Sequence, residues 1–225
     1  YNVSDGDRPH MPLDQSIFTI YNDQQTGGGF GGEPIGAEVR QLLYGGVDGN
    51  DQPADANGSF EQVFYVHYEI VNKSDLTWYS PRFGIFMDPD IGPNYANDLV
   101  GTLENENMVY TYNGEDNEDG FETPPAVGVK VLGAKPGDFG GEHNLSIYAG
   151  GALCSSCLGD GLDTWDPDND PTAYYRLNGL DNYGVPIINP NTGEQSLWQF
   201  DGDPTDGSGW IDNVLQDKRI LISIA

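Results

Sequence analysis

Aspartates at i, i+2 and i, i+3 spacing recur along this chain in loops that also contain Gly and Pro. Carboxylates held on irregular backbone are the oxygen ligands that a hard cation such as Ca²⁺ accepts, so we expect bound calcium. Each group of aspartates is equally consistent with solvated turns, in which the Asp side chain bonds to the nearby backbone. The candidate ligands are Asp88, Asp90 and Asp98 for one ion, Asp163, Asp166, Asp168 and Asp170 for a second, and Asp201, Asp203, Asp206 and Asp212 for a third.

The charge balance agrees with a need for cations. The chain has 9 Lys and Arg against 36 Asp and Glu, which gives a formal net charge of −27. Such a surface repels nucleic acid and anionic membranes, so neither is an expected partner. Its self-repulsion also opposes a compact fold unless cations lie among the carboxylates. The alternative interpretation of the charge is a solubilising acidic coat.

The two cysteines, Cys154 and Cys157, stand in a Gly-rich segment. A zinc site needs further soft ligands, and none of the three histidines has a paired spacing. The βαβ context of a thioredoxin-like motif is also missing. We therefore expect a local disulfide between Cys154 and Cys157, formed in an oxidising compartment.

Aromatic residues indicate a second kind of binding. The chain contains 4 Trp and 13 Tyr, and Trp165 lies within an acidic loop. Most large aromatic side chains serve packing, but an exposed Trp165 could stack on a sugar ring, as in a carbohydrate-binding module. Glycans are therefore candidate partners.

Catalytic signatures are not found. The chain contains neither Gly-x-Ser-x-Gly nor His-Glu-x-x-His. Paired carboxylates could serve glycoside hydrolysis, but in so acidic a chain such pairs carry little information. We expect a protein that is not an enzyme.

Strands must position these side chains, because strand patterns dominate and clear helix signals are absent. Residues 60–71 alternate regularly and predict a long central strand with one face in the core. The fold class expected is all-β, an antiparallel sandwich or jelly roll in a single domain over residues 1–225, with two small domains as the alternative. Long acidic loops would join the strands, ordered by bound ions. The other predicted strands are 16–21, 37–44, 77–87, 108–112, 126–132, 144–148, 196–200 and 219–224.

The chain ends in an apolar strand over residues 220–225. Such a strand either lies inside its own sheet or completes the sheet of a neighbouring copy, and repeated completion would build a filament. Self-association is therefore one expectation for this chain.

A series of short motifs, in order along nearly the whole chain, resembles a group of large secreted proteins of Bacteroidota-type bacteria, many of which end in a type IX secretion sorting domain. The motifs are Asp14-Gln-Ser-Ile-Phe-Thr-Ile-Tyr-Asn-Asp23, Ile35-Gly-Ala-Glu-Val39, Tyr68-Glu-Ile-Val-Asn-Lys-Ser74, Asp88-Pro-Asp-Ile-Gly92, Asn97-Asp-Leu-Val-Gly101, Tyr110-Thr-Tyr-Asn-Gly114, Pro124-Pro-Ala-Val-Gly128, Tyr174-Tyr-Arg-Leu-Asn-Gly179, Phe200-Asp-Gly-Asp-Pro204, Gly209-Trp-Ile-Asp212 and Asp217-Lys-Arg-Ile-Leu-Ile-Ser223.

The resemblance implies export, an extracellular or cell-surface location and a β-rich module, but no chemistry. This chain departs from the group at Thr102-Leu103, where Cys and Asp are common, and in lacking Gly-Pro-Phe after the final strand. We therefore expect a piece or an unusual member of such a protein. The sequence as a whole predicts a calcium-stabilised structural or adhesive module, with a carbohydrate-binding module as the alternative.

Overall fold

The computed structural model describes residues 4, 15–24, 33–45, 63–133, 147–154 and 162–224. In this part of the chain antiparallel sheets dominate, and they belong to two compact units, Tyr1–Thr77 and Trp78–Ala225. The expectation of an all-β fold is confirmed, whereas the jelly-roll topology stays a prediction.

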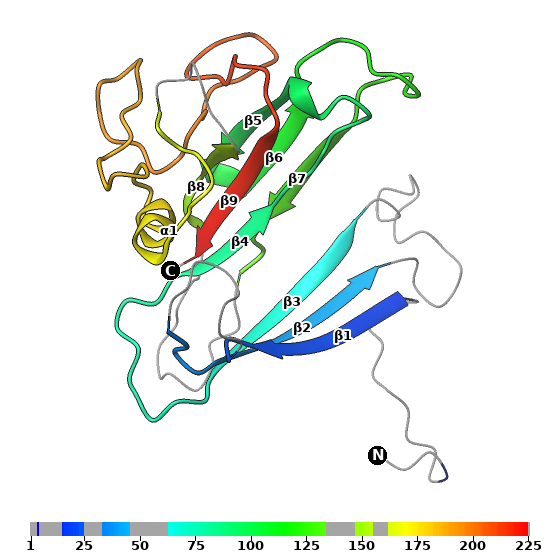
Figure 1. Ribbon diagram of the computed structural model, residues 1–225. Helices are drawn as coiled ribbons and strands as arrows, with labels where there is room; N and C mark the ends of the chain where they lie inside the picture. Colours follow the sequence, from blue (N-terminus) through cyan, green and yellow to red (C-terminus); the bar gives the residue numbers. More distant parts are fainter. Residues whose placement is uncertain are drawn as a thin grey trace. The chain divides into compact units, whose positions relative to one another are not determined.

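The first unit contains a three-stranded antiparallel sheet in the order β1-β2-β3 (Figure 1). Its strands are β1 (Gln15–Asn22), β2 (Ala37–Gly45) and β3 (Phe64–Asn72). The interpretation of 60–71 as a central strand is wrong, because β3 forms an edge of the described sheet and β2 lies in its middle. Phe64, the first residue of β3, is 65% exposed.

The second unit contains two three-stranded antiparallel sheets that face each other. One has the order β4-β9-β8, from β4 (Phe83–Met87), β9 (Lys218–Ile224) and β8 (Ile147–Cys154). The other has the order β5-β6-β7, from β5 (Asp98–Leu103), β6 (Met108–Asn113) and β7 (Ala126–Lys130). Figure 1 shows β9, from the end of the chain, between β4 and β8.

The core of this unit lies between its two sheets. Alternate residues of β9, Ile220 and Ile222, are fully buried against Val100 of β5 and Val109 of β6. Each such side chain contributes roughly 1.5–3 kcal/mol when it leaves water. Loop aromatics complete the same cluster, among them Trp198, Phe200 and Trp210. This core fixes the strand ends from which the acidic loops begin.

Five of the predicted strands are confirmed to within one or two residues: 16–21, 37–44, 108–112, 126–132 and 219–224. Of 77–87 only the second half is a strand, and the strand expected at 144–148 is displaced to β8. Residues 196–200 form no strand, and Trp198 makes a single bridge to Gly150. Strand β5 was not expected from the sequence.

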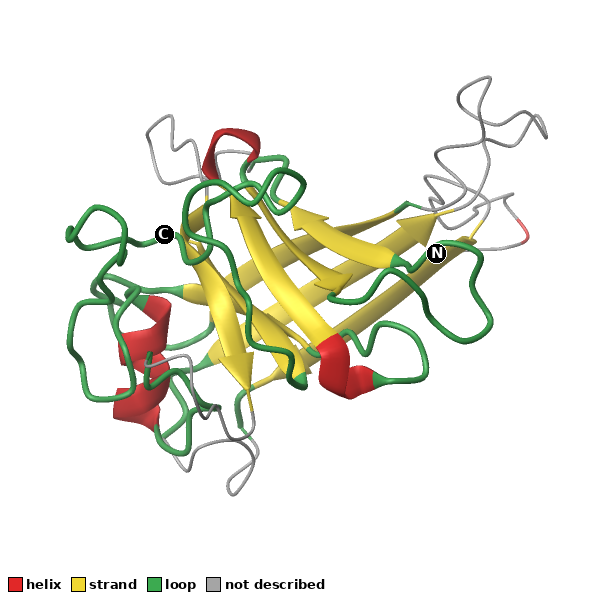
Figure 2. Cartoon of the chain, turned by 90° about the horizontal axis from the view of Figure 1, so that it is seen from above, coloured by secondary structure: helices red, strands yellow, loops and turns green. Residues whose placement is uncertain are grey.

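A short helix, α1 (Asp170–Leu177), also was not expected (Figure 2). Its N-cap is Asn169, whose side-chain oxygen accepts a hydrogen bond from the backbone N–H of Thr172 at 2.9 Å. Pro171 follows in the first turn, where its missing N–H costs nothing. The cap and the proline together favour the start of a helix. The composition of this segment predicts only an acidic loop.

Two alternatives were open for the C-terminal strand, and in the structure it lies inside its own sheet, paired with β4 and β8. The outer edges of β5 and β8 are also occupied. Thr102 of β5 donates its backbone N–H to the carbonyl oxygen of Phe200, and Gly150 of β8 donates to that of Leu197, both at 3.0 Å. Neither of these edges is free to accept a strand from another copy.

Candidate metal centre

The register of β4 against β9 brings together aspartates that are far apart in the sequence. Met87, the last residue of β4, pairs with Ile220. The same register, continued past the strand end, sets Asp90 opposite Asp217. Carboxylate oxygens of Asp88, Asp90 and Asp217 lie within 4.8 Å of one another. Among the residues that the structure describes, this acidic cluster is the one group of three or more acidic, His or Cys side chains close enough to hold a metal ion.

Asp98, the first residue of β5, lies beside the acidic cluster. Its backbone forms a bridge to Gln216, the residue before Asp217. The residue is 1% exposed; its Oδ2 accepts a hydrogen bond from the N–H of Ile91 at 3.2 Å, and its buried Oδ1 has no hydrogen-bond partner in the described protein. Burial, and then the charges of Asp90 and Asp217, raise the pKa of Asp98 to about 7. A buried carboxylate oxygen without a partner is costly, so Asp98 points to a cation.

One guanidinium is paired with these carboxylates. The Nε atom of Arg219 lies 3.2 Å from Asp88 Oδ2 and 3.5 Å from Asp166 Oδ2, and its Nη2 lies 3.2 Å from Asp217 Oδ2. Burial raises the pKa of Asp88 and of Asp166 in spite of this guanidinium, and the charge of Asp217 adds to the effect. A single positive charge therefore faces more carboxylates than it can neutralise.

The loop between β4 and β5 is held in place by Glu118. This carboxylate accepts a hydrogen bond from the backbone N–H of Asn94 at 3.2 Å and another from the side chain of Asn97, also at 3.2 Å. These bonds, with that of Asn113, lower the pKa of Glu118, so it stays charged. Gly92 has a φ of +77°, and a Cβ there would overlap the Glu118 side chain. Glu118 therefore anchors the loop between β4 and β5, which limits how far Asp90 can move away from Asp217.

The donor set fits calcium. The acidic cluster offers only oxygen ligands, from Asp88 and Asp90 in one segment and from Asp217 in another; Asp98 lies beside it and is not one of the three converging carboxylates. Ca²⁺ takes about 6–8 oxygens at about 2.3–2.6 Å, and backbone carbonyls or water can complete such a shell. The absence of His and Cys from the cluster disfavours zinc and other soft-ligand metals. Of these residues, the sequence grouped Asp88, Asp90 and Asp98, and it missed Asp217 and Arg219.

The second predicted group does not come together. Asp163 adopts a left-handed conformation with a φ of 47°. Asp168 accepts a hydrogen bond from the Asn169 side chain at 2.6 Å, and Asp170 is the first residue of α1. Asp166 turns instead toward Arg219, as described above. The residues form a turn, a helix start and an ion pair.

The third predicted group is likewise dispersed into turns. Asp203 Oδ1 accepts hydrogen bonds from the N–H of Thr205 at 2.8 Å and from its hydroxyl at 2.6 Å. Asp206 Oδ1 accepts one from the N–H of Ser208 at 2.8 Å. These are Asx turns, in which the carboxylate bonds to the backbone two residues on. Asp201 accepts a longer bond of 3.4 Å from the side chain of Asn189.

Asp212, the last member of that group, is buried in the core. Its Oδ2 lies 3.2 Å from the Nζ of Lys218, and both side chains are almost fully buried, with 1% and 0% exposed. It also accepts the backbone N–H of Val100 at 3.0 Å. The ammonium group lies 5.9 Å from the centre of the Phe200 ring. Asp212 is thus an internal ion-pair partner and not part of the acidic cluster.

The remaining predicted site residues are in two places. Trp165 is half-buried and its ring contacts that of Tyr183. Cys154 ends β8, but its side chain and Cys157 lie outside the described residues, so the disulfide stays a prediction.

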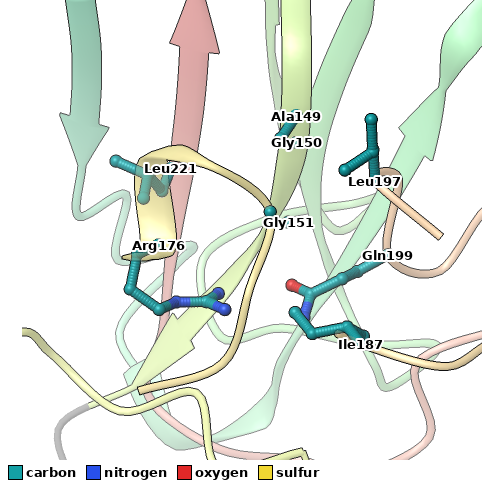
Figure 3. Close-up of a pocket in the computed structure, with 9 residues that line it drawn as sticks. Ala149, Gly150, Gly151, Arg176, Ile187, Leu197, Gln199 and Leu221 are labelled. Carbon is teal, nitrogen blue, oxygen red and sulfur yellow. The ribbon is translucent and has the colours of Figure 1, made fainter. Parts of the chain in front are cut away.

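A small pocket lies behind β8 (Figure 3). Arg176 extends into it from α1 and donates a hydrogen bond of 3.1 Å to the carbonyl of Ala152. Gln199 accepts the N–H of Ala152 at 2.8 Å, and this approach requires Gly151, whose Cβ would overlap the Gln199 amide. The space left is roughly that of a single water molecule, far less than a sugar ring needs. The pocket is therefore part of the packing of α1 on β8.

In the described part of the chain, no helix has the length and apolar character to cross a membrane. Comparison with known proteins found no matching family model, no similar curated protein and no similar solved structure.

Proposed function

We propose that this protein is a non-enzymatic structural or adhesive module, exported from the cell, whose second unit is stabilised by calcium bound among Asp88, Asp90, Asp98 and Asp217. The observation that supports this most directly is the buried Asp98 Oδ1, which lacks a hydrogen-bond partner in the described protein. The exposed carboxylates beside it supply the remaining charge.

The position of the ion explains how it would stabilise the fold. Its ligands come from the end of β4, the start of β5 and the residue before β9, so one ion would join both sheets of the unit. Without a cation, the repulsion between Asp90 and Asp217 opposes continuation of the β4–β9 register. Bound calcium would neutralise both carboxylates and hold the two segments together. This favours a role in stabilising the module over a role in calcium signalling.

The proposed extracellular location agrees with calcium as the ion, because a partly exposed site of this kind suits the millimolar calcium found outside cells. The acidic cluster and its partner Arg219 contain no nucleophilic side chain placed beside a general base. We therefore assign these carboxylates to cation binding and not to catalysis.

The experiment is thermal unfolding of the whole chain in excess calcium and in chelator, followed by circular dichroism. An ion that binds only the native state stabilises it by about 2.7 kcal/mol at a hundredfold excess over its Kd, so the melting temperature should rise with calcium concentration. Asp90→Asn should reduce that rise strongly. Asp90 is exposed, so this change leaves the core untouched.

Asp119→Asn is the matched control, since it removes the same charge from an exposed position outside the acidic cluster. It should keep the full calcium effect. The proposal fails if the melting temperature is the same in calcium and chelator, or if Asp90→Asn and Asp119→Asn respond to calcium identically.

A further inference from the structure

The rings of Trp165 and Tyr183 meet at nearly a right angle. The centres of the Trp165 and Tyr183 rings are 5.4 Å apart, and their planes meet at 81°. Trp165 is half-buried, whereas Tyr183 is 67% exposed. In a packed core, a tyrosine in contact with a tryptophan would be mostly buried. Here most of the Tyr183 side chain is exposed to solvent.

The backbone around this pair is held by buried polar side chains. Asn182, which is 6% exposed, donates its side-chain N–H to the carbonyl of Trp165 at 2.9 Å and its backbone N–H to the carbonyl of Asp163 at 3.0 Å. Asp181 Oδ1 accepts the N–H groups of Tyr183 at 2.9 Å and of Val185 at 2.8 Å. The two loop segments that carry Trp165 and Tyr183 are therefore tied together through their backbones.

The helix α1 adds a third ring. A Cβ built on Gly184 would lie 3.2 Å from Cζ of Tyr175, so the turn after Tyr183 runs directly along this ring. Gly184 has a φ of +79°, which a residue with a side chain rarely adopts. Tyr175 is 37% exposed. The aromatic site, which we define as Trp165, Tyr175 and Tyr183, thus presents partly exposed rings from two loop segments and from α1.

We propose that the aromatic site binds a neutral glycan. Sugar rings carry apolar C–H faces that stack on aromatic side chains and hydroxyl groups that donate to carboxylates. The exposed carboxylates of Asp163 and Asp168 lie in the same loop as Trp165 and can accept such bonds. Acidic sugars would be repelled by the chain's formal charge of −27, which is why the ligand is neutral. A second copy of this chain is an alternative occupant that the test separates.

This inference does not rest on the calcium proposal. Trp165 lies next to Asp166, which pairs with Arg219, but the bonds that fix the aromatic site come from Asn182 and Asp181. Thermal unfolding reports the ion, and glycan binding reports the aromatic site. A failure of one experiment therefore leaves the other interpretable.

The test uses the whole chain and soluble neutral oligosaccharides of β-glucose, of mannose and of N-acetylglucosamine, each titrated to millimolar concentration by calorimetry. Saturable binding to at least one of them is expected. Tyr183→Ala should weaken it by about 30-fold or more, as truncation of a central aromatic contact typically does. Trp165→Ala should have a similar effect, with circular dichroism to confirm that it folds. Phe121→Ala is the control, because Phe121 is 48% exposed in the loop between β6 and β7 and its removal should change nothing.

Several results would overturn the proposal. One is the absence of saturable binding to every neutral oligosaccharide in the panel. Another is binding that Tyr183→Ala retains at full affinity, which would place the glycan elsewhere. Preference for polygalacturonate or alginate over the neutral sugars would contradict the charge argument. If Tyr183→Ala instead changed the mass of the particle in light scattering without any glycan, the surface would be a contact between copies.

Discussion

The acidic cluster of Asp88, Asp90 and Asp217 and the loop that carries Asp203 and Asp206 have the same composition but opposite arrangements. In the cluster, carboxylates from separate strand ends converge within 4.8 Å. In the loop, each carboxylate bonds to the backbone N–H two residues further on, at 2.8 Å. Short spacing alone therefore does not separate a turn from an ion site, because the cluster also needs Asp217, which strand register brings to Asp88 and Asp90. At the cluster, Asp88 and Asp217 share the single guanidinium of Arg219, so negative charge remains there for a cation to neutralise.

A second contrast lies among the buried acids. Asp212 is 2% exposed and pairs with Lys218, while Asp98 is 1% exposed and one of its oxygens has no hydrogen-bond partner in the described protein. Both lie in the second unit, and both have a pKa raised mainly by burial. The protein thus supplies a cation of its own to one buried carboxylate, and we propose that calcium serves the other.

The largest effect should come from breaking the internal pair. Asp212→Ala leaves the ammonium of Lys218 buried without its carboxylate and removes the acceptor of the Val100 N–H. We expect a loss of about 3–5 kcal/mol in the free energy of unfolding, measured by urea denaturation. The double variant Asp212→Ala with Lys218→Met should recover much of this loss, because no unpaired charge remains. A single variant as stable as the wild type would show that this pair does not differ from the exposed ion pairs.

The next effect concerns Asp98 and pH. Its carboxyl group has a folded pKa of about 7, above the usual value of 3.8, so the folded state binds this proton more tightly than the unfolded chain. The free energy of unfolding of the calcium-free protein should therefore fall as pH rises from about 4 to about 7, by at most about 4 kcal/mol from this group. Above pH 7 the penalty is complete.

Urea denaturation in chelator across this pH range measures the effect. Asp98→Asn is the control, since it removes the titrating group and keeps the Oδ acceptor for the Ile91 N–H. Its stability should depend less on pH than that of the wild type. Equal pH dependence in the two proteins would mean that Asp98 is not the group that opposes folding at neutral pH, and the contrast with Asp212 would lose its basis.

The candidate site was half visible in the sequence. The sequence groups Asp88 with Asp90 by their spacing and assigns Asp98 to the same ion. Asp217 could not be found in this way, because its place depends on the pairing of Met87 with Ile220 across the sheet. Knowing which residue of β4 faces which residue of β9 requires the tertiary structure.

Local signals explain what was found and missed in the fold. Strands rich in β-branched and aromatic residues, such as β1 and β6, were predicted well. Strand β5 was missed because Asp98, Gly101 and Thr102 interrupt its apolar pattern, although Thr102 is buried. The helix α1 did have a signal, the Asn169 cap followed by Pro171, which the surrounding acidic residues obscured. Tertiary packing against the core decided these cases.

The smallest effect is expected at Asp206, and it is the sharpest check on the opening contrast. Asp206→Asn removes one negative charge but keeps an oxygen that can accept the Ser208 N–H, as Asp206 does at 2.8 Å. Because the turn bond needs only an acceptor, the free energy of unfolding should stay within about 0.5 kcal/mol of the wild type, and the calcium-induced rise in melting temperature should be unchanged. Asp206→Ala, which loses the acceptor, should cost about 1 kcal/mol. If Asp206→Asn instead reduced the calcium effect as Asp90→Asn does, the loop would be an ion site in its own right, and spacing along the sequence would predict calcium binding better than strand register does.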